Sequence, residues 1–128
     1  MTNHESVAQR AIEAWNTHEV DRVLECYTDD LVYRDPNTRG EVRGAAAFGR
    51  YLGKMFALWE MHWHVDRVYP FSDAEGAAAL WTATLKFRNG GEPVPVAGMD
   101  LTLVRDGRLS RNEVFFDRVA ISELLGRG

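Results

Sequence analysis

Apolar side chains recur every three to four residues through the first half of the chain, which is the period of an amphipathic helix. The first stripe consists of Ala8, Ala11, Ile12 and Trp15. A second, shorter stripe consists of Val20, Val23, Leu24 and Tyr27. A third stripe contains Phe48, Tyr51, Leu52, Met55, Phe56 and Trp59. The pattern therefore predicts three helices, and Thr2, Asn3 or Ser6 is available as the N-cap of the first one.

The second half of the chain is typical of strands joined by tight turns. Residues 61–69, 77–87, 93–104 and 108–117 are rich in β-branched and aromatic side chains, and Asn89-Gly90 and Asp106-Gly107 are hairpin signals. A shorter strand is expected over Leu31–Asp35, before a polar loop, and a C-terminal helix over residues 117–125. Helices followed by hairpin-linked strands predict an α+β fold, with the helices on one face of an antiparallel sheet.

The composition excludes several classes of protein. A chain of 128 residues with 45% hydrophobic and 27% charged residues is expected to form a single domain over residues 1–128. The net charge of -4, with both signs interspersed, argues against a nucleic-acid surface. No apolar run approaches the length of a membrane span, and the N-terminus has no signal-peptide core. Cys26 is the single cysteine, so we expect a reducing, cytoplasmic environment.

The strand over residues 93–104 is apolar on both of its faces. Met99, Leu101 and Leu103 alternate with Val96, Thr102 and Val104 along it. The helices can cover only one face of the sheet, and soluble monomers tend to avoid a large apolar surface. We therefore expect a second copy of the chain to cover the other face, as a homodimer formed through the sheet.

Three aspartates are the candidate catalytic residues. Asp100 stands in the middle of an apolar strand, where aspartate is uncommon, so it is either solvent-facing, paired or kept protonated by apolar surroundings. Asp35 precedes Pro36, so it either ends a strand as a turn residue or lines a pocket. Asp117 follows the last strand and could cap the C-terminal helix or face a pocket.

Other reactive side chains give weaker signals. His62 and His64 lie two residues apart on one strand face, but no third metal ligand accompanies them, so we expect them in a pocket or core. Cys26 has no histidine nearby to activate it, which argues against a catalytic thiol. No phosphate-binding glycine loop, nucleophile elbow or dinucleotide fingerprint is present. We expect no metal and no cofactor.

The order of these elements, together with local sequence, resembles a known family. The residues concerned are WNTHEVDRVLECYTDDLVYRDP, Arg43-Gly44, VAGMDLTLVRDGRL and FFDRVAISELLG. They resemble the nuclear transport factor 2-like superfamily, in its SnoaL-like polyketide cyclase and ketosteroid isomerase branch. The resemblance covers nearly the whole chain. It implies a cone (a cystatin-like α+β roll), in which a curved antiparallel sheet wraps against three N-terminal helices around a deep apolar pocket.

The resemblance also implies roles for the aspartates. Ketosteroid isomerases use the aspartate of a strand-ending Asp-Pro as general base, which matches Asp35, and a protonated aspartate in a later strand, which matches Asp100. Their oxyanion-hole tyrosine on the first helix is replaced by Ala11. SnoaL-like cyclases have an acid/base aspartate on the last strand, and Asp117 is the nearest match. The related limonene epoxide hydrolases need an Arg-x-Asp pair that residues 77–87 do not offer, so we do not expect that reaction.

Together these features predict a cofactor-independent acid/base enzyme that acts on a small apolar or polycyclic carbonyl compound. Isomerisation, aldol cyclisation and dehydration all remain open. The residues expected to contact the substrate are Trp15, Tyr33, Tyr51, Trp59, His62, Trp63, His64 and Phe116. The alternative is a non-catalytic module of the same fold that binds a small molecule or mediates dimerisation.

Overall fold

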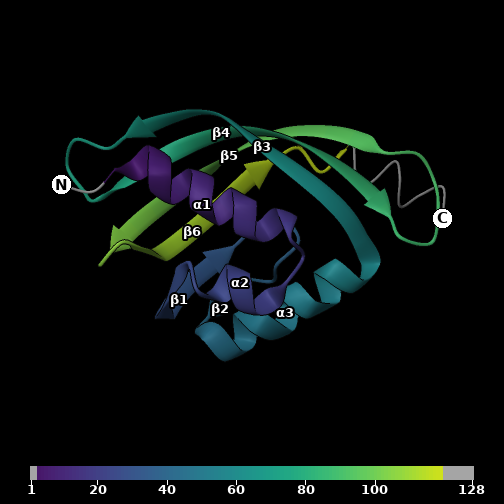
Figure 1. Cartoon of the computed structure of the whole chain (residues 1–128), viewed down its shortest axis with the longest axis horizontal. Coiled ribbons are helices and arrows are strands. Elements are labelled where there is room, and N and C mark those ends of the chain that lie inside the picture. The colour runs from purple at the N-terminus through teal and green to yellow at the C-terminus, as the bar shows by residue number, and fades with distance from the viewer. Residues whose placement is uncertain (1–2, 120–128) are drawn as a thin grey trace.

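The computed structural model describes residues 3–119 and has the α+β architecture that the sequence predicts. The helices are α1 (His4–Asn16), α2 (Val20–Leu24) and α3 (Ala45–Leu58). The strands are β1 (Tyr27–Arg34), β2 (Val42–Arg43), β3 (Trp59–Pro70), β4 (Gly76–Phe87), β5 (Val94–Arg105) and β6 (Arg108–Phe116). The strands form one sheet in the order β2-β1-β6-β5-β4-β3, which curves around the helices on its concave side (Figure 1).

The pairing of strands is antiparallel except at one place. Strands β3 to β6 pair in sequence order through hairpins, whereas β1 runs parallel to β6, with Tyr33 opposite Asn112. Asp106 and Gly107 both have positive φ, 54° and 76°, which is the conformation of a type I′ hairpin turn. The parallel pair brings the end of β1 beside the middle of β6. Side chains from the two halves of the chain therefore meet there.

Some element boundaries differ from the predicted ones. Tyr27 begins β1 rather than ending α2, because its ring is buried in the core with only 1% of its surface exposed. Strand β1 ends at Arg34, so Asp35 is the first residue of the following turn. Trp59 begins β3 instead of closing α3. The loop before α3 contains the short strand β2, and most of the predicted C-terminal helix lies outside the described residues.

The first residues of α1 and α3 are set by the residues that precede them, Asn3 and Gly44. The side chain of Asn3, one of the predicted caps, accepts a hydrogen bond from the Ser6 N–H at 3.1 Å. Helix α3 begins after Gly44, whose φ of 85° lies in the left-handed region that favours glycine. The Gly44 N–H donates to the Leu31 carbonyl oxygen at 2.8 Å, which attaches the start of α3 to β1.

The core lies between the helices and the concave face of the sheet. Its centre is Phe48 of α3, which is fully buried and whose ring lies 4.9 Å from the ring of Tyr27 and 4.7 Å from that of Tyr33. Trp15 of α1 contacts the same group, with 6.1 Å between its ring and that of Phe48. This aromatic cluster joins α1, α3 and β1, and two of its members, Trp15 and Tyr33, line the site described below.

The end of α1 is tied to β3, the edge strand of the sheet. The Asn16 side chain pairs with the Trp63 backbone in both directions, donating to its carbonyl oxygen at 2.9 Å and accepting from its N–H at 2.8 Å. His18 Nε2 accepts from the Met61 N–H at 3.0 Å, so its other ring nitrogen, Nδ1, carries the proton that contacts the Asn16 carbonyl oxygen. Burial and the positive charge of Arg88 lower the pKa of His18.

Low pH should weaken the hydrogen bond between His18 and the Met61 N–H. A doubly protonated imidazole has no acceptor for the Met61 N–H. Because the pKa of His18 is lower in the folded protein than in the unfolded chain, this stabilisation is complete above pH 6.5 and is lost as the pH falls below it. We expect the Tm of the parent to fall more steeply between pH 7 and pH 5 than that of His18→Gln, measured by thermal denaturation. The exposed His62→Gln is the control, and an equal slope in the His18→Gln variant would disprove the role of His18.

The outer face of the sheet carries apolar side chains that the helices do not cover. Phe115 is 43% exposed and Leu80 is 36% exposed, and Met99, Leu101 and Leu103 are partly exposed. The homodimer through this face stays a prediction.

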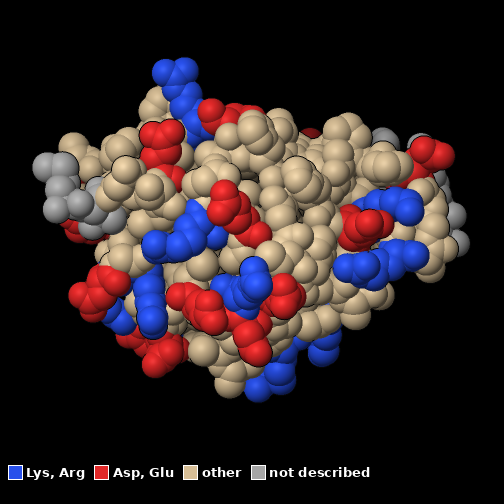
Figure 2. Space-filling view, in the orientation of Figure 1, with Lys and Arg blue, Asp and Glu red and all other residues tan. Residues whose placement is uncertain are grey.

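Lys, Arg, Asp and Glu side chains are interspersed over the face of the molecule shown in Figure 2, without a patch of one sign. No described helix has the length and apolar character needed to cross a membrane.

Candidate functional site

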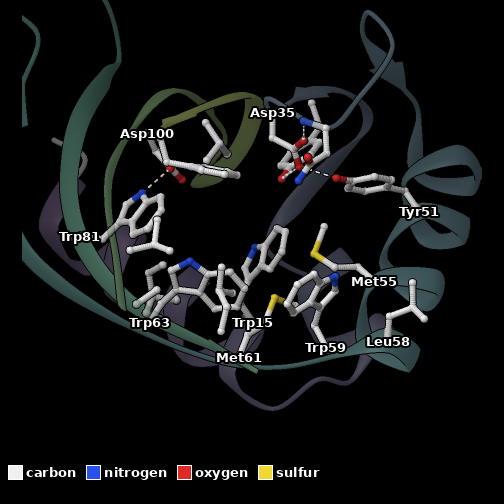
Figure 3. Close-up of a pocket in the computed structure, with 18 of the residues that line it drawn as sticks. Trp15, Asp35, Tyr51, Met55, Leu58, Trp59, Met61, Trp63, Trp81 and Asp100 are labelled. Atoms are coloured by element: carbon white, nitrogen blue, oxygen red, sulfur yellow. Dashed lines mark hydrogen bonds between the residues drawn. The ribbon is translucent and has the colours of Figure 1, made fainter. Parts of the chain in front are cut away.

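A cavity of about 330 Å³ opens between α1, α3 and the concave face of the sheet (Figure 3). All four tryptophans of the chain line it, together with further apolar side chains and two aspartates. Its described lining residues are Ile12, Trp15, Tyr33, Asp35, Asn37, Tyr51, Lys54, Met55, Leu58, Trp59, Met61, Trp63, Trp81, Ala83, Leu85, Val96, Asp100, Val114 and Phe116. A concave apolar space with few polar groups is typical of a small-molecule site.

Asp100 lies at one end of the cavity, on β5. Trp81 Nε1 on β4 donates to its Oδ1 at 2.7 Å, and Asn112 Nδ2 on β6 donates to its Oδ2 at 3.0 Å. Figure 3 shows the Trp81 indole directed at this carboxylate. The two neighbouring strands therefore hold the carboxylate in place from either side. The sequence alternative of a solvent-facing Asp100 does not hold, because the residue lines the cavity and has two buried partners.

The surroundings of Asp100 shift its acidity. Burial raises the pKa of its carboxyl group from 3.8 to about 6, and the hydrogen bonds from Asn112 and Trp81 oppose this shift. The negative charge of Asp35 adds to the increase. Because the folded protein holds this proton more tightly than the unfolded chain does, the contribution of Asp100 to stability falls as the pH rises from 3.8 to about 6. At neutral pH the carboxylate is mostly ionised, yet it lies close to the range useful for proton transfer.

Asn112 continues into a buried chain of hydrogen bonds. Its Oδ1 accepts from the Tyr27 hydroxyl at 2.7 Å, and the Tyr27 oxygen accepts from Trp15 Nε1 at 3.1 Å. Tyr27 and Asn112 are 1% and 2% exposed. Burial raises the pKa of Tyr27, so its hydroxyl keeps its proton. Helix α1 is thereby linked, through β1 and β6, to the carboxylate on β5.

Asp35 lies at the other end, in the turn after β1. Its Oδ1 accepts from the backbone N–H groups of Asn37 at 2.7 Å and Thr38 at 3.1 Å. Its Oδ2 accepts from the hydroxyl groups of Tyr33 at 2.7 Å and Tyr51 at 2.5 Å. Both sequence interpretations of Asp35 therefore apply, because one oxygen organises the turn while the other lies at the cavity with two tyrosines.

The two tyrosines act as permanent donors to Asp35. Burial raises the pKa of Tyr33 and of Tyr51 far above the ordinary value, and the negative charge of Asp35 adds to both shifts. Each hydroxyl therefore stays protonated, and its hydrogen is directed at the carboxylate. We call Asp35, Tyr33 and Tyr51 the turn cluster. Figure 3 shows Asp35 and Tyr51 on the opposite side of the cavity from Asp100 and Trp81.

The cavity brings together eight of the residues that the sequence singled out. These are Asp35, Asp100, Trp15, Tyr33, Tyr51, Trp59, Trp63 and Phe116. Asp117 is exposed, does not line the cavity, and accepts a hydrogen bond from the Val119 N–H at 2.9 Å, as its capping interpretation predicts. His62 and His64 are also exposed, which corrects the expectation that they contact a ligand: β3 alternates, and it is Met61 and Trp63 that face inward.

Some lining residues were not recognised from the sequence. Trp81 and Asn112 hold Asp100, yet Trp81 occurs in an ordinary strand pattern and Asn112 resembles a surface residue of the last strand. A polar asparagine on the same strand parity as the apolar Val114 and Phe116 was the one available signal. Within residues 3–119, no cluster of three histidine, cysteine or acidic side chains could hold a metal ion.

The comparisons with known proteins agree with this geometry. The model of the SnoaL-like domain family matches residues 8–112. No curated protein matches the sequence. Because the family match spans most of the chain, the resemblance recognised in the sequence is confirmed at the level of superfamily and branch.

Solved structures with the same fold share little sequence with this chain. A protein from Bacillus subtilis assigned as an isomerase is 16% identical, with a TM-score of 0.84 over 99% of this chain and 98% of that one. A protein from Pseudomonas putida assigned as a polyketide cyclase is 18% identical, with a TM-score of 0.82 over 96% and 97%. TerC, co-crystallised with polyporic acid, is 16% identical, with a TM-score of 0.83 over 96% and 98%. At such identities the likeness shows the fold alone.

Proposed function

We propose that this chain, which belongs to the family of SnoaL-like domains, is a cofactor-independent acid/base enzyme that acts on a small apolar carbonyl compound. The observation that supports this most directly is the arrangement of the cavity. Asp35 and Asp100, 65 positions apart in the sequence, line the same space of about 330 Å³ among four tryptophans. Carboxylates that share an apolar site are the usual means of moving a proton next to a carbonyl group without a metal.

The reaction class follows from what these groups can exchange. A carboxylate removes a proton from the carbon beside a carbonyl group, and the resulting enolate takes a proton back at the same or another carbon. Isomerisation, aldol cyclisation and dehydration all begin with this step. The raised pKa of Asp100, about 6, places one carboxyl group near the pH at which such transfers are efficient.

The developing enolate oxygen needs a donor, and Ala11 offers none. Trp63 is the candidate: its side chain lines the cavity, and its indole N–H makes no hydrogen bond within residues 3–119. The two backbone hydrogen bonds to Asn16 fix its position on β3. Figure 3 places Trp63 beside Trp81, on the same side of the cavity as Asp100. A neutral donor in an apolar site stabilises a developing oxyanion.

Hydrogen exchange on a model ketone tests this function. In D2O, 2-tetralone exchanges the protons next to its carbonyl group, and proton NMR follows the loss of signal. We expect the parent to accelerate the exchange and the double variant Asp35→Asn/Asp100→Asn to lose about 100-fold or more of that acceleration, because neither amide can accept the proton. The exposed Asp73→Asn is the matched control and should exchange at the parent rate. A parent no faster than buffer would disprove the enzymatic proposal.

The second candidate is a binding module of the same fold without chemistry. The four hydrogen bonds that occupy both Asp35 oxygens favour this binding module, because a carboxylate with a purely structural role would have the same partners. TerC, which has the same fold, was co-crystallised with a small molecule, polyporic acid. Because all four tryptophans line the cavity, a ligand should change the tryptophan fluorescence. Saturable binding of 2-tetralone without exchange would support the binding module and reject the enzyme.

A further inference from the structure

The two aspartates of the cavity differ in how their hydrogen bonds are arranged. Asp100 has two donors, one on each oxygen, whereas Asp35 has four, two on each oxygen. A carboxylate oxygen accepts about two hydrogen bonds in its plane. Asp100 therefore keeps one open lone pair on each oxygen, while Asp35 has none free in that plane. This difference bears on which group receives the substrate proton.

The buried chain behind Asp100 fixes the direction of its hydrogen bonds. The indole nitrogens of Trp15 and Trp81 only donate. The Tyr27 oxygen accepts from Trp15, so the Tyr27 hydrogen must go to Asn112 Oδ1, and the Asn112 amide N–H groups then face Asp100. If the amide were turned over to accept a proton from Asp100, the buried Tyr27 hydroxyl would lose its acceptor, which is costly. The chain therefore runs from Trp15 through Tyr27 to Asn112, and Asn112, like Trp81, donates to Asp100 as an acceptor.

The turn cluster is arranged differently. The hydroxyl hydrogens of Tyr33 and Tyr51 are both directed at Asp35 Oδ2, and Asp35 Oδ1 is held by the turn backbone. For Asp35 to take a proton from carbon, at least one of these bonds would have to break. What the cluster can offer a ligand is the lone pairs of the tyrosine oxygens, which are acceptors. A hydroxyl group on the ligand suits this end of the cavity, whereas a bare carbonyl group finds no donor in the cluster.

We propose that Asp100 is the catalytic proton acceptor, and that Asp35, Tyr33 and Tyr51 bind a hydroxyl group at the far end of the substrate. This inference rests on the proposed function and reverses the roles that the family resemblance implies for Asp35 and Asp100. In the catalytic step, an Asp100 oxygen forms a bond to the proton while the C–H bond of the substrate breaks. The electron pair of that C–H bond moves into the enolate. While the enolate is bound, the carboxyl proton of Asp100 exchanges with solvent, and Asp100 then returns a proton, or in D2O a deuteron, to the carbon. The preferred substrates are hydroxylated ketones with a flat apolar body.

Two related ketones test this division of roles. 2-Tetralone has the acidic carbon but no hydroxyl group, and 6-hydroxy-2-tetralone adds a hydroxyl on the other ring. We expect the parent to bind the hydroxylated ketone about tenfold more tightly, because its hydroxyl donates to a tyrosine oxygen that itself donates to the Asp35 carboxylate, and hydrogen bonds in such a network strengthen one another. Tyr51→Phe should leave Asp35 in place yet reduce this preference. Equal KM values for both ketones in the parent would overturn the anchoring role.

Single substitutions separate the two carboxylates. Asp100→Asn should lower kcat for exchange by about 100-fold or more on both ketones, whereas Asp35→Asn should mainly raise KM for the hydroxylated one. The opposite result, with exchange lost in Asp35→Asn and kept in Asp100→Asn, would overturn the roles while leaving the enzyme itself intact. Absence of exchange in the parent would instead reject the enzyme. Circular dichroism confirms that each variant is folded, and Tyr51→Phe provides an independent probe if Asp35→Asn does not fold.

The pH profile gives a readout that a structural role would not affect. The titratable groups facing Asp100 are Asp35 from the turn after β1 and Tyr27 from β1. Its hydrogen-bond partners on β4 and β6 are Trp81 and Asn112, and Trp15 on α1 contacts Tyr27; none of these three side chains titrates in this range. The exchange rate in the parent should rise to a plateau above about pH 6, the pKa of Asp100. A profile that is flat between pH 5 and pH 8 would contradict Asp100 as the proton acceptor.

Discussion

Replacing Asn112 by leucine is expected to destabilise the protein by about 3–5 kcal/mol and to raise the pKa of Asp100 above about 6. Asn112 is 2% exposed and links the Tyr27 hydroxyl to the Asp100 carboxylate. Leucine has a similar size but accepts and donates nothing, so a buried hydroxyl and a buried carboxylate each lose a partner. Urea denaturation measures the stability, and NMR of the Asp100 carboxyl carbon measures the pKa.

The control for Asn112→Leu is Thr102→Val, on the neighbouring strand. Thr102 is 8% exposed, and its hydroxyl donates one hydrogen bond, to the Ala77 carbonyl oxygen at 3.0 Å. The loss of one neutral hydrogen bond should cost about 1 kcal/mol and leave the pKa of Asp100 unchanged. If both variants lose the same stability, the chain from Trp15 to Asp100 is not a coupled unit. An unchanged pKa in Asn112→Leu would exclude Asn112 as a positioning residue for Asp100.

Gly98→Ala is expected to destabilise the protein by about 2–3 kcal/mol and to weaken the site, although the change adds only one methyl group. A Cβ at Gly98 would lie 2.5 Å from the Phe115 carbonyl oxygen and 2.5 Å from the Trp81 ring. Gly98 faces Trp81 across the β4–β5 pair and Phe116 across the β5–β6 pair. Either the backbone of β6 must shift or the Trp81 indole must move, and the latter would remove its hydrogen bond to Asp100.

Gly53→Ala, on α3, is the matched control. Gly53 is exposed, and nothing lies within 4 Å of an added Cβ there, so alanine should stabilise the helix by about 0.5–1 kcal/mol. Denaturation and the binding of 6-hydroxy-2-tetralone, followed by tryptophan fluorescence, would be measured on both variants. Unchanged binding and stability in Gly98→Ala would mean that the sheet adapts to the methyl group without loss at the cavity.

Much of the candidate site could be recognised in the sequence because its residues break local patterns. Asp100 is a charge within an apolar strand, and Asp35 stands between a strand-like run and a proline. Both line the cavity. The predictions that failed concern residues whose local sequence pattern does not distinguish an inward from an outward side chain. The parity of β3 is ambiguous because His62, Trp63 and His64 are all residues that pockets use, and only packing against α1 decides which of them face inward.

By itself, the sequence determined the order and type of the elements and the α+β class, because hydrophobic period and turn chemistry are local properties. It also identified Asp35 and Asp100 as two carboxylates in unexpected positions. Tertiary structure alone decided the burial and the hydrogen-bond partners of those carboxylates. The parallel pairing of β1 with β6 brings two distant segments side by side. Together with the antiparallel pairing of β5 with β6, it places Tyr27, Asn112 and Asp100 in one hydrogen-bonded chain. The acidity of a carboxylate depends on its burial and on its partners, and both are fixed only when strands far apart in the sequence come together.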